Sequence, residues 1–140
     1  MDKYDILLNV KGTHCEHDEE ATVELITEGS LICDDDKYTI EFDESGLTGV
    51  KDTTTRLTVD GDRLWLKRSG ALNGELMFAG KRLYETAYKT PGGLMRVSIL
   101  PTMIKSDVSA SKGRIDLEYV INTGSQSAIN RLNIDYKKRN

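Results

Sequence analysis

The densest set of side chains capable of chemistry lies near the N-terminus, in the run His14-Cys15-Glu16-His17-Asp18-Glu19-Glu20. Imidazole, thiolate and carboxylate groups are the ligands that zinc takes in proteins, so His14, Cys15 and His17 are candidate metal ligands. The spacing matches neither a CxxC pair nor a helical HExxH motif, and only Cys33 could add a similar ligand from elsewhere. The sequence favours the simpler alternative, a solvated turn between the first two strands.

Nucleophilic catalysis needs a serine or cysteine held beside a general base, which is usually histidine. The chain holds two histidines, His14 and His17, and both fall in the segment just described. A hydrolase would have to fold that segment over the mouth of a pocket. We therefore expect a binding protein rather than an enzyme, with no cofactor, and keep an enzyme or metal protein based on His14, Cys15 and His17 as a further alternative.

The elements that position these residues are predicted to be β-strands. Apolar and polar residues alternate between closely spaced glycine turns, and this period of two places one side of each strand toward a core. Residues 114–122 show it most clearly, since Ile115, Leu117 and Tyr119 alternate with charged residues. The pair Asp60-Gly61 predicts a two-residue hairpin turn. The predicted strands cover residues 3–13, 20–33, 37–44, 49–59, 63–68, 74–79, 82–89, 93–105, 113–122 and 128–137.

Strands that follow one another through hairpins predict an all-β fold, a single antiparallel meander rolled into a barrel over one domain, residues 1–140. Closure of the sheet removes the exposed edges that invite aggregation. A β-sandwich is the alternative, because the stretch from Lys105 to Lys112 could hold a crossover connection. A chain of 140 residues has the length of one ordinary domain.

Composition narrows the partners and the compartment that we expect. The net charge is −4 at pH 7, so neither nucleic acid nor a membrane is an expected partner. The first residues contain no apolar stretch of signal-peptide length. The two cysteines, Cys15 and Cys33, could form one disulfide at most, and we expect free thiols in the cytoplasm.

Several short patches, taken in order, resemble a known family. The resemblance covers the chain from about Thr53 onward well and the first strands loosely. The patches are Thr53-Thr54-Thr55-Arg56-Leu57, Leu66-Lys67-Arg68-Ser69-Gly70, Met77-Phe78, Tyr88-Lys89-Thr90-Pro91-Gly92-Gly93 and Gly113-Arg114-Ile115 with Leu117 and Tyr119. They resemble the YwiB-like family of uncharacterised bacterial proteins, and the resemblance implies a calycin-type, lipocalin-like β-barrel. Calycin relatives hold small hydrophobic molecules in the barrel, whereas the family itself implies no activity.

The alternation of the strands also predicts which polar side chains face the barrel interior. If Leu64 and Leu66 point inward, Arg68 does too. Residues Tyr84, Tyr88 and Thr90, together with Thr86, share one face of their strand, and Tyr119 lies among inward apolar residues. We expect Arg68, Tyr84, Tyr88, Thr90 and Tyr119 to line a pocket for a small hydrophobic, amphipathic or anionic ligand. The competing interpretation puts Arg68 at the barrel rim, paired with a nearby carboxylate for structural reasons.

A second class of function starts from the opposite face of the same strand. Trp65 alternates with Leu64 and Leu66, so it should point outward. Tryptophan is enriched among the residues that dominate protein interfaces. A protein-interaction module, with a solid barrel core and Trp65 as an anchor, is therefore the main alternative to ligand binding.

Overall fold

The computed structural model describes residues 2–43, 53–71, 73–124 and 126–139 of the chain. Ten strands are found in this part: β1 (Asp2–Glu16), β2 (Glu19–Asp34), β3 (Lys37–Asp43), β4 (Thr53–Asp60), β5 (Arg63–Gly70), β6 (Gly74–Ala79), β7 (Tyr84–Thr90), β8 (Gly93–Val108), β9 (Lys112–Thr123) and β10 (Gln126–Lys138). Each corresponds to one predicted strand, so the all-β prediction is confirmed. The predicted strand residues 44 and 49–52 lie outside the described residues.

All ten strands belong to one antiparallel sheet with the order β6-β5-β4-β3-β2-β1-β10-β9-β8-β7. Neighbours in the sequence are neighbours in space, and β1 also pairs with β10, which brings the two ends of the chain together. The opening in the ring lies between β6 and β7. In the described part, one bridge joins that side, with Asn73 and Lys89 exchanging two backbone hydrogen bonds of 2.8 Å. The fold is thus a nearly closed barrel, and the sandwich alternative is wrong.

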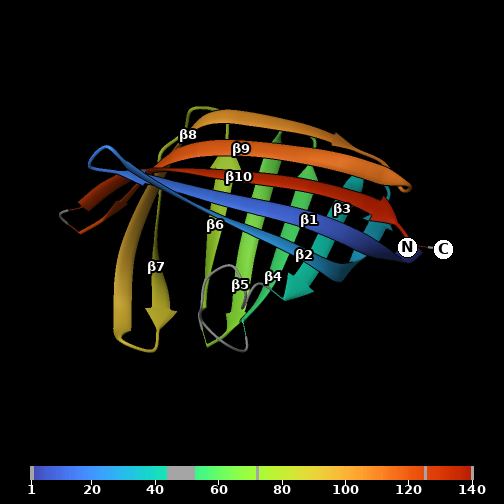
Figure 1. The fold of residues 1–140 in the computed structure, drawn as a ribbon, viewed down its shortest axis with the longest axis horizontal. Helices are drawn as coiled ribbons and strands as arrows, with labels where there is room; N and C mark the ends of the chain where they lie inside the picture. Colours follow the sequence, from blue (N-terminus) through green and yellow to red (C-terminus); the bar gives the residue numbers. More distant parts are fainter. Residues whose placement is uncertain (1, 44–52, 72, 125, 140) are drawn as a thin grey trace.

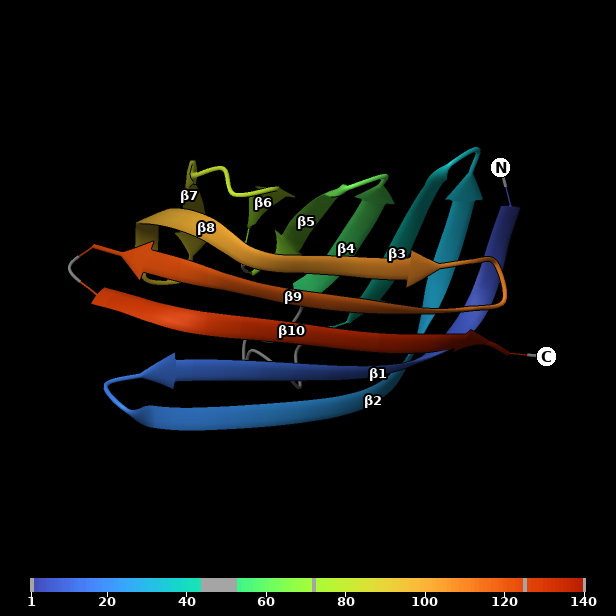
Figure 2. The same cartoon turned by 90° about the horizontal axis from the view of Figure 1, so that it is seen from above.

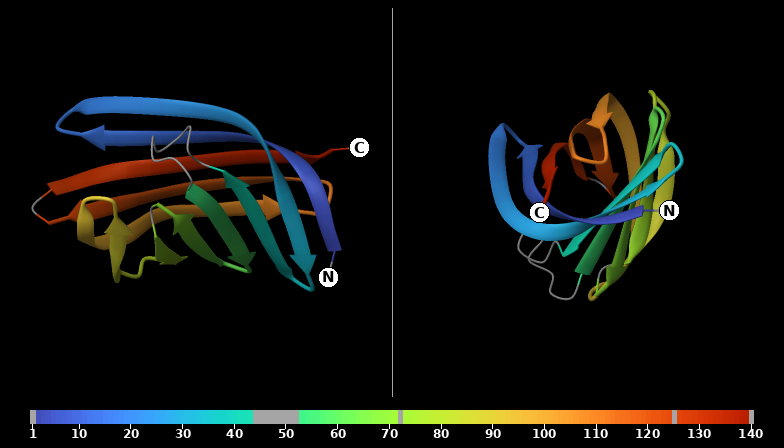
Figure 3. Two further views of the ribbon diagram at one scale, coloured as in Figure 1. Left: turned by 90° about the horizontal axis from the view of Figure 1, so that it is seen from below. Right: turned by 90° about the vertical axis from the view of Figure 1, so that its right-hand side faces the viewer.

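The sheet curls so strongly that its two halves cross. In Figure 1 β1, β2, β9, β10 and the later part of β8 run nearly horizontally, while β3 to β6 cross behind them and β7 runs nearly vertically at the left. Figure 2 shows the same two sets from above. The end-on view in Figure 3 shows the sheet bending round on itself. No helix of the described part is long and apolar enough to cross a membrane.

The core fills the space between the two halves. Alternate residues of each strand point inward, as the period of two requires. Leu64 and Leu66 of β5 are each 1% exposed, and Ile115 and Leu117 of β9 are fully buried. Phe78 of β6 is also fully buried. The predicted inside and outside faces of these strands are therefore confirmed.

Two hairpin turns differ in detail from expectation. β1 continues to Glu16, so His14 and Cys15 lie in a strand and not in the predicted loop. The turn itself consists of His17 and Asp18, whose φ angles of 51° and 64° fit a type I′ hairpin. In the second turn Asp60 pairs with Arg63, so the turn residues are Gly61 and Asp62 and not Asp60-Gly61. Gly61 adopts a φ of 63°, which glycine takes without steric cost.

Candidate functional site

A row of polar side chains crosses the inner face of three neighbouring strands. His14 of β1 lies opposite Asn130 of β10, which lies opposite Tyr119 of β9. The His14 Nδ1 and Asn130 Oδ1 atoms are 2.6 Å apart, and His14 Nε2 lies 3.0 Å from Glu16 Oε2. Glu16 and His14 share the inner face because they are two residues apart on β1. The end of the long β1–β2 hairpin therefore carries a linked Glu16-His14-Asn130 group.

Arg68 reaches the same region from β5, on the other half of the barrel. Its Nη1 donates a hydrogen bond of 3.2 Å to the Tyr88 hydroxyl, and its guanidinium carbon lies 5.9 Å from the centre of the Tyr88 ring. Tyr88 is 3% exposed, and its ring covers Gly74, where an added Cβ would overlap ring atoms. Arg68 itself is half-buried. The packed tyrosine thus orients the guanidinium through both its hydroxyl and its ring.

Two threonines of β4 lie beside Arg68 on the inner face. Thr55 is directly opposite Arg68 in the β4–β5 ladder, and Thr53 is opposite Gly70. Each is 1% exposed, and neither hydroxyl has a hydrogen-bond partner in the part of the chain that the structure describes. Buried hydroxyls are normally hydrogen-bonded, because an unsatisfied one costs free energy. These two hydroxyls are therefore unusual polar groups on the otherwise apolar inner face of β4.

A pocket of about 210 Å³ opens at this end of the barrel. Arg68 and Tyr119 border it, together with the row that contains His14 and Asn130. Its other lining residues are Gly12, Thr13, Ala21, Val23, Arg131 and Leu132. Tyr119 also packs edge-on against Phe78, with ring centroids 5.0 Å apart, so the core supports the wall of the pocket. Two arginines and several hydrogen-bonding groups thus border a small space, and one of the arginines, Arg131, is already paired with Glu118.

The structure brings together some of the predicted pocket residues. Arg68 contacts Tyr88 and shares the pocket with Tyr119. Tyr84 lies elsewhere, partly buried against the core and opposite Ile99. The Thr90 hydroxyl donates to the carbonyl oxygen of Gly93 at 2.7 Å within the β7–β8 hairpin. Neither Tyr84 nor Thr90 borders this pocket.

The three candidate metal ligands do not converge on one point. His14 and Cys15 are adjacent on β1, so their side chains point to opposite faces of the sheet. His17 is 85% exposed in the turn, where its Nε2 lies 3.5 Å from Glu16 Oε1. No group of three or more His, Cys, Asp and Glu side chains suited to a metal ion occurs among the described residues. The arrangement also separates the Cys15 thiol from His14 as a possible base.

On the outer face of the sheet, charged side chains form ion pairs across neighbouring strands. Arg56 is paired with Glu41 at 2.8 Å, and Arg131 with Glu118 at 2.9 Å. The Arg131 bond, with a second from Thr102, lowers the pKa of Glu118 below its ordinary value. Charged groups on these ladders are satisfied by their cross-strand neighbours, as is usual on a solvated sheet.

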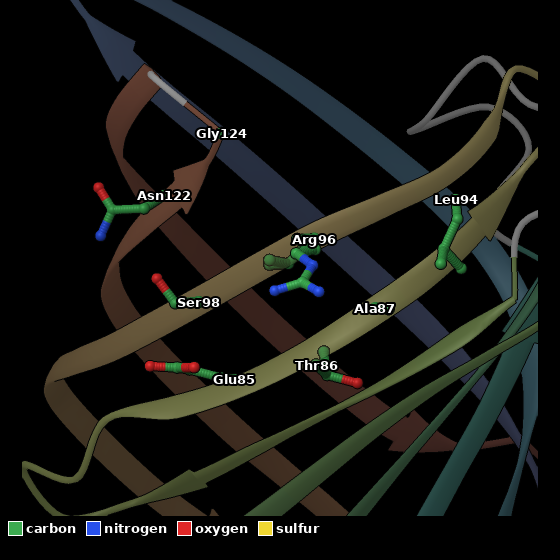
Figure 4. Close-up of a pocket in the computed structure, with 9 residues that line it drawn as sticks. Glu85, Thr86, Ala87, Leu94, Arg96, Ser98, Asn122 and Gly124 are labelled. Atoms are coloured by element: carbon green, nitrogen blue, oxygen red, sulfur yellow. The ribbon is translucent and has the colours of Figure 1, made fainter.

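A larger cavity, of about 570 Å³, lies against β7, β8 and the end of β9. Glu85, Ser98 and Asn122 form one row across these three strands, and Figure 4 shows their side chains on the same side of the ribbon. Arg96 also lines it. Glu85 and Arg96 are exposed, so water already solvates the charged groups of this surface. The smaller pocket is the stronger candidate because Arg68, Asn130 and Tyr119 are partly or fully buried.

Trp65, the proposed interaction anchor, lies on the outer face in a row with Thr58 and Met77. Its outward direction agrees with the prediction from the pleat. All three residues are half-buried. The role of Trp65 as an anchor stays a prediction.

The fold and the pocket together define a class: a β-barrel protein with a small polar pocket at one end. A family model described as "Domain of unknown function (DUF1934)" matches residues 8–134, and the chain belongs to that family. The solved structure described as the crystal structure of ywiB protein from Bacillus subtilis has the same fold. Its TM-score is 0.87 at 21% sequence identity, over 99% of this chain and 94% of that one. Comparison with curated proteins gives no match.

Sequence reasoning missed several residues of the site. Asn130 lies in a strand whose inner positions are otherwise apolar, and no polar role is predicted for Thr53 or Thr55 from the sequence. A signal for the threonines was present, because their alternation with Leu57 and Val59 places them on the buried face. The contact of Asn130 with His14 had no such signal, since 116 residues separate the two in sequence.

Proposed function

We propose that this protein binds a small anion, carrying a carboxylate or phosphate group, on the inner face of the barrel beside Arg68. A guanidinium matches the geometry of both groups and forms charge-assisted hydrogen bonds with them. Tyr88 holds the guanidinium through a 3.2 Å hydrogen bond and its packed ring, so little side-chain freedom remains to be lost on binding. The nearby His14 and Asn130 supply further polar contacts.

The observation that carries this proposal is the pair of unsatisfied threonine hydroxyls next to Arg68. A buried hydroxyl without a partner costs about 1–3 kcal/mol. The hydroxyls of Thr53 and Thr55 are both fully buried and without a partner among the described residues. An anion oxygen that accepts from one of them would remove that cost, and the same oxygen atoms would face the cation.

The size of the pocket limits the ligand. Pockets for drug-sized molecules usually measure roughly 300–1,000 Å³. This one measures about 210 Å³. The apolar residues beneath it are packed together, so the proposal favours a compact anion over an amphipathic molecule with a long tail.

The proposal retains two expectations from the sequence. One is the calycin-like use of a barrel interior for binding, which rests on family resemblance and fold analogy. The other is a cytoplasmic location, which the free thiols of Cys15 and Cys33 support.

Isothermal titration calorimetry with inorganic phosphate and with small mono- and dicarboxylates tests this function. The wild-type protein should bind at least one of them. Arg68→Ala should weaken that binding about tenfold or more, since a hydrogen bond to a charged group contributes about 1.5–3 kcal/mol.

Arg56→Ala is the matched control. Arg56 lies on the neighbouring strand β4, but on the outer face, where it pairs with Glu41. Its removal should leave anion binding unchanged. Failure of every anion to bind the wild-type protein, or equal weakening by both substitutions, would contradict the proposal.

A further inference from the structure

The first part of β2 has a strand on one side only. β1 pairs with β2 from Glu19 to Cys33, whereas β3 pairs with β2 from Gly29 to Asp34. Within the described ranges, the second edge of residues 19–28 therefore has no paired strand. Figure 2 shows β2 along the border of the sheet, with β3 beside it only toward its C-terminal end. A long unpaired edge offers backbone N–H and C=O groups to another extended chain.

The two faces of this edge carry different chemistry. Ala21, Val23 and Leu25 point to the inner face, where Val23 is 42% exposed and Leu25 packs partly against the core. Glu20, Glu24 and Glu28 point to the outer face. An added strand would continue both faces, because its own side chains alternate with the same period of two.

We propose that residues 19–28 of β2 dock an extended peptide in which apolar and basic residues alternate. The peptide would join the sheet as a new strand through backbone hydrogen bonds, a known mode of peptide recognition. Its apolar side chains would cover Ala21, Val23 and Leu25. Its basic side chains would lie beside Glu20, Glu24 and Glu28.

The charge of the edge selects this occupant over a second copy of the chain. Residues 19–28 include four glutamates, Glu19, Glu20, Glu24 and Glu28, and no lysine or arginine. Glu28 is paired with Arg139 at 3.2 Å, while Glu19, Glu20 and Glu24 have no ion pair among the described residues. Two such edges side by side would oppose like charges, which destabilises cross-strand pairs. A basic peptide gains attraction where a second copy would meet repulsion.

This docking surface goes beyond the proposed anion site, although the two lie close together. Ala21 and Val23 also border the pocket that contains Arg68. The peptide contacts do not involve Arg68 itself. Arg68→Ala should therefore keep peptide binding, which allows the two proposals to fail separately.

Fluorescence anisotropy with a synthetic peptide of alternating lysine and valine tests the docking. The wild-type protein should bind this peptide more tightly than a peptide of the same composition with its lysines grouped together. Glu24→Lys should weaken binding about fivefold or more, since it turns an attractive surface pair of about 1 kcal/mol into a repulsive one. Glu85→Lys, an equal charge change at an exposed position on β7, should have no effect.

Hydrogen exchange locates the bound peptide. Backbone amides within residues 19–28 should gain protection when the peptide is added. Three results would overturn the proposal: equal binding of the grouped peptide, protection confined to another strand, or a dimer joined through this edge in sedimentation experiments on the protein alone.

Discussion

Two tyrosines at different ends of the barrel each pack their ring over a glycine, but their hydroxyl groups bind different partners. Tyr136 lies near the C-terminal end of β10 and covers Gly113, while Tyr88 of β7 covers Gly74. Figure 1 shows the C-terminal end of β10 beside the chain termini and β7 at the opposite end. Both are nearly fully buried, at 4% and 3% exposure. In each case a side chain on the glycine would overlap the aromatic ring, so glycine is required on the facing strand.

The hydroxyl groups of the two tyrosines end in different surroundings. The Tyr136 hydroxyl donates to the Ser109 carbonyl oxygen at 2.7 Å and accepts from the Ser109 N–H at 3.2 Å. The Tyr88 hydroxyl accepts from Arg68, which borders the pocket. The Tyr136 hydroxyl is therefore tied to the backbone of a turn, while the Tyr88 hydroxyl holds the side chain of a cation. The same aromatic-glycine pair can fix a turn or orient a cation, depending on which group the tyrosine hydroxyl meets.

Alanine substitution of the two glycines should give the largest change in stability and should separate the two tyrosine-glycine pairs. Gly113→Ala should lower the free energy of unfolding by about 3 kcal/mol, because a shift of the Tyr136 ring would break both hydrogen bonds between its hydroxyl and the Ser109 backbone. Gly74→Ala should cost about 1 kcal/mol, since the Tyr88 hydroxyl is bonded to the Arg68 side chain, which borders a cavity and can move with the ring. Urea unfolding of both variants gives the comparison. Equal costs would show that the two ends are equally rigid.

The second largest effect should be a loss of stability at high pH, caused by ionisation of Tyr136. Burial raises the pKa of Tyr136 from 10.0 to about 12, so the unfolded chain loses this proton at lower pH than the folded protein does. The stabilisation is complete below pH 10 and is lost as pH rises toward 12. In this range the wild-type protein should lose up to about 1.4 kcal/mol of stability per pH unit relative to Tyr136→Phe. Urea unfolding of both proteins from pH 9 to 11.5 measures it, and parallel curves would contradict the assignment.

Removal of a threonine hydroxyl should produce the smallest effect, with a sign that is unusual for a buried position. Thr55→Val keeps the shape of the side chain and removes an unsatisfied polar atom, so the unbound protein should gain about 1 kcal/mol. The same change should weaken anion binding. Thermal unfolding and calorimetry measure the two effects.

Thr39→Val is the control for that substitution. The Thr39 hydroxyl lies 3.2 Å from that of Thr58 and is hydrogen-bonded. Its loss should destabilise the protein by up to about 1 kcal/mol. A destabilised Thr55→Val protein would mean that the Thr55 hydroxyl is satisfied, and it would remove the main support for the anion site.

Most of the fold was predictable because strand periodicity is a local property. The alternation around Leu64, Leu66 and Arg68 assigns each side chain to a face without knowledge of its partners. The prediction went wrong at the first hairpin, where charged and polar residues from His14 to Glu16 read as a loop. Strand β1 continues there because β2 and β10 both pair with it, and these ladders outweigh the weak β-propensity of the segment.

The candidate site was predictable only in part. Arg68, Tyr88 and Tyr119 were placed on inner faces from the pleat alone, and the structure gathers them at one end. Tyr84 was assigned to the same site because it shares the inner face of β7 with Tyr88, yet it packs against the core. The alternation of a strand predicts which face a side chain lies on, but it does not predict the position of that side chain along the barrel axis. That position depends on the register between strands.

The sequence by itself determined which side of each strand is apolar and therefore which side chains face inward. Only the tertiary structure decided which inward side chains meet. Arg68 and His14 come to border one pocket because the sheet curls and twists until its two halves cross, and the accumulated twist depends on all the strands together. The alternation of a strand is set within a few residues, whereas the closure of a barrel is a property of the whole sheet.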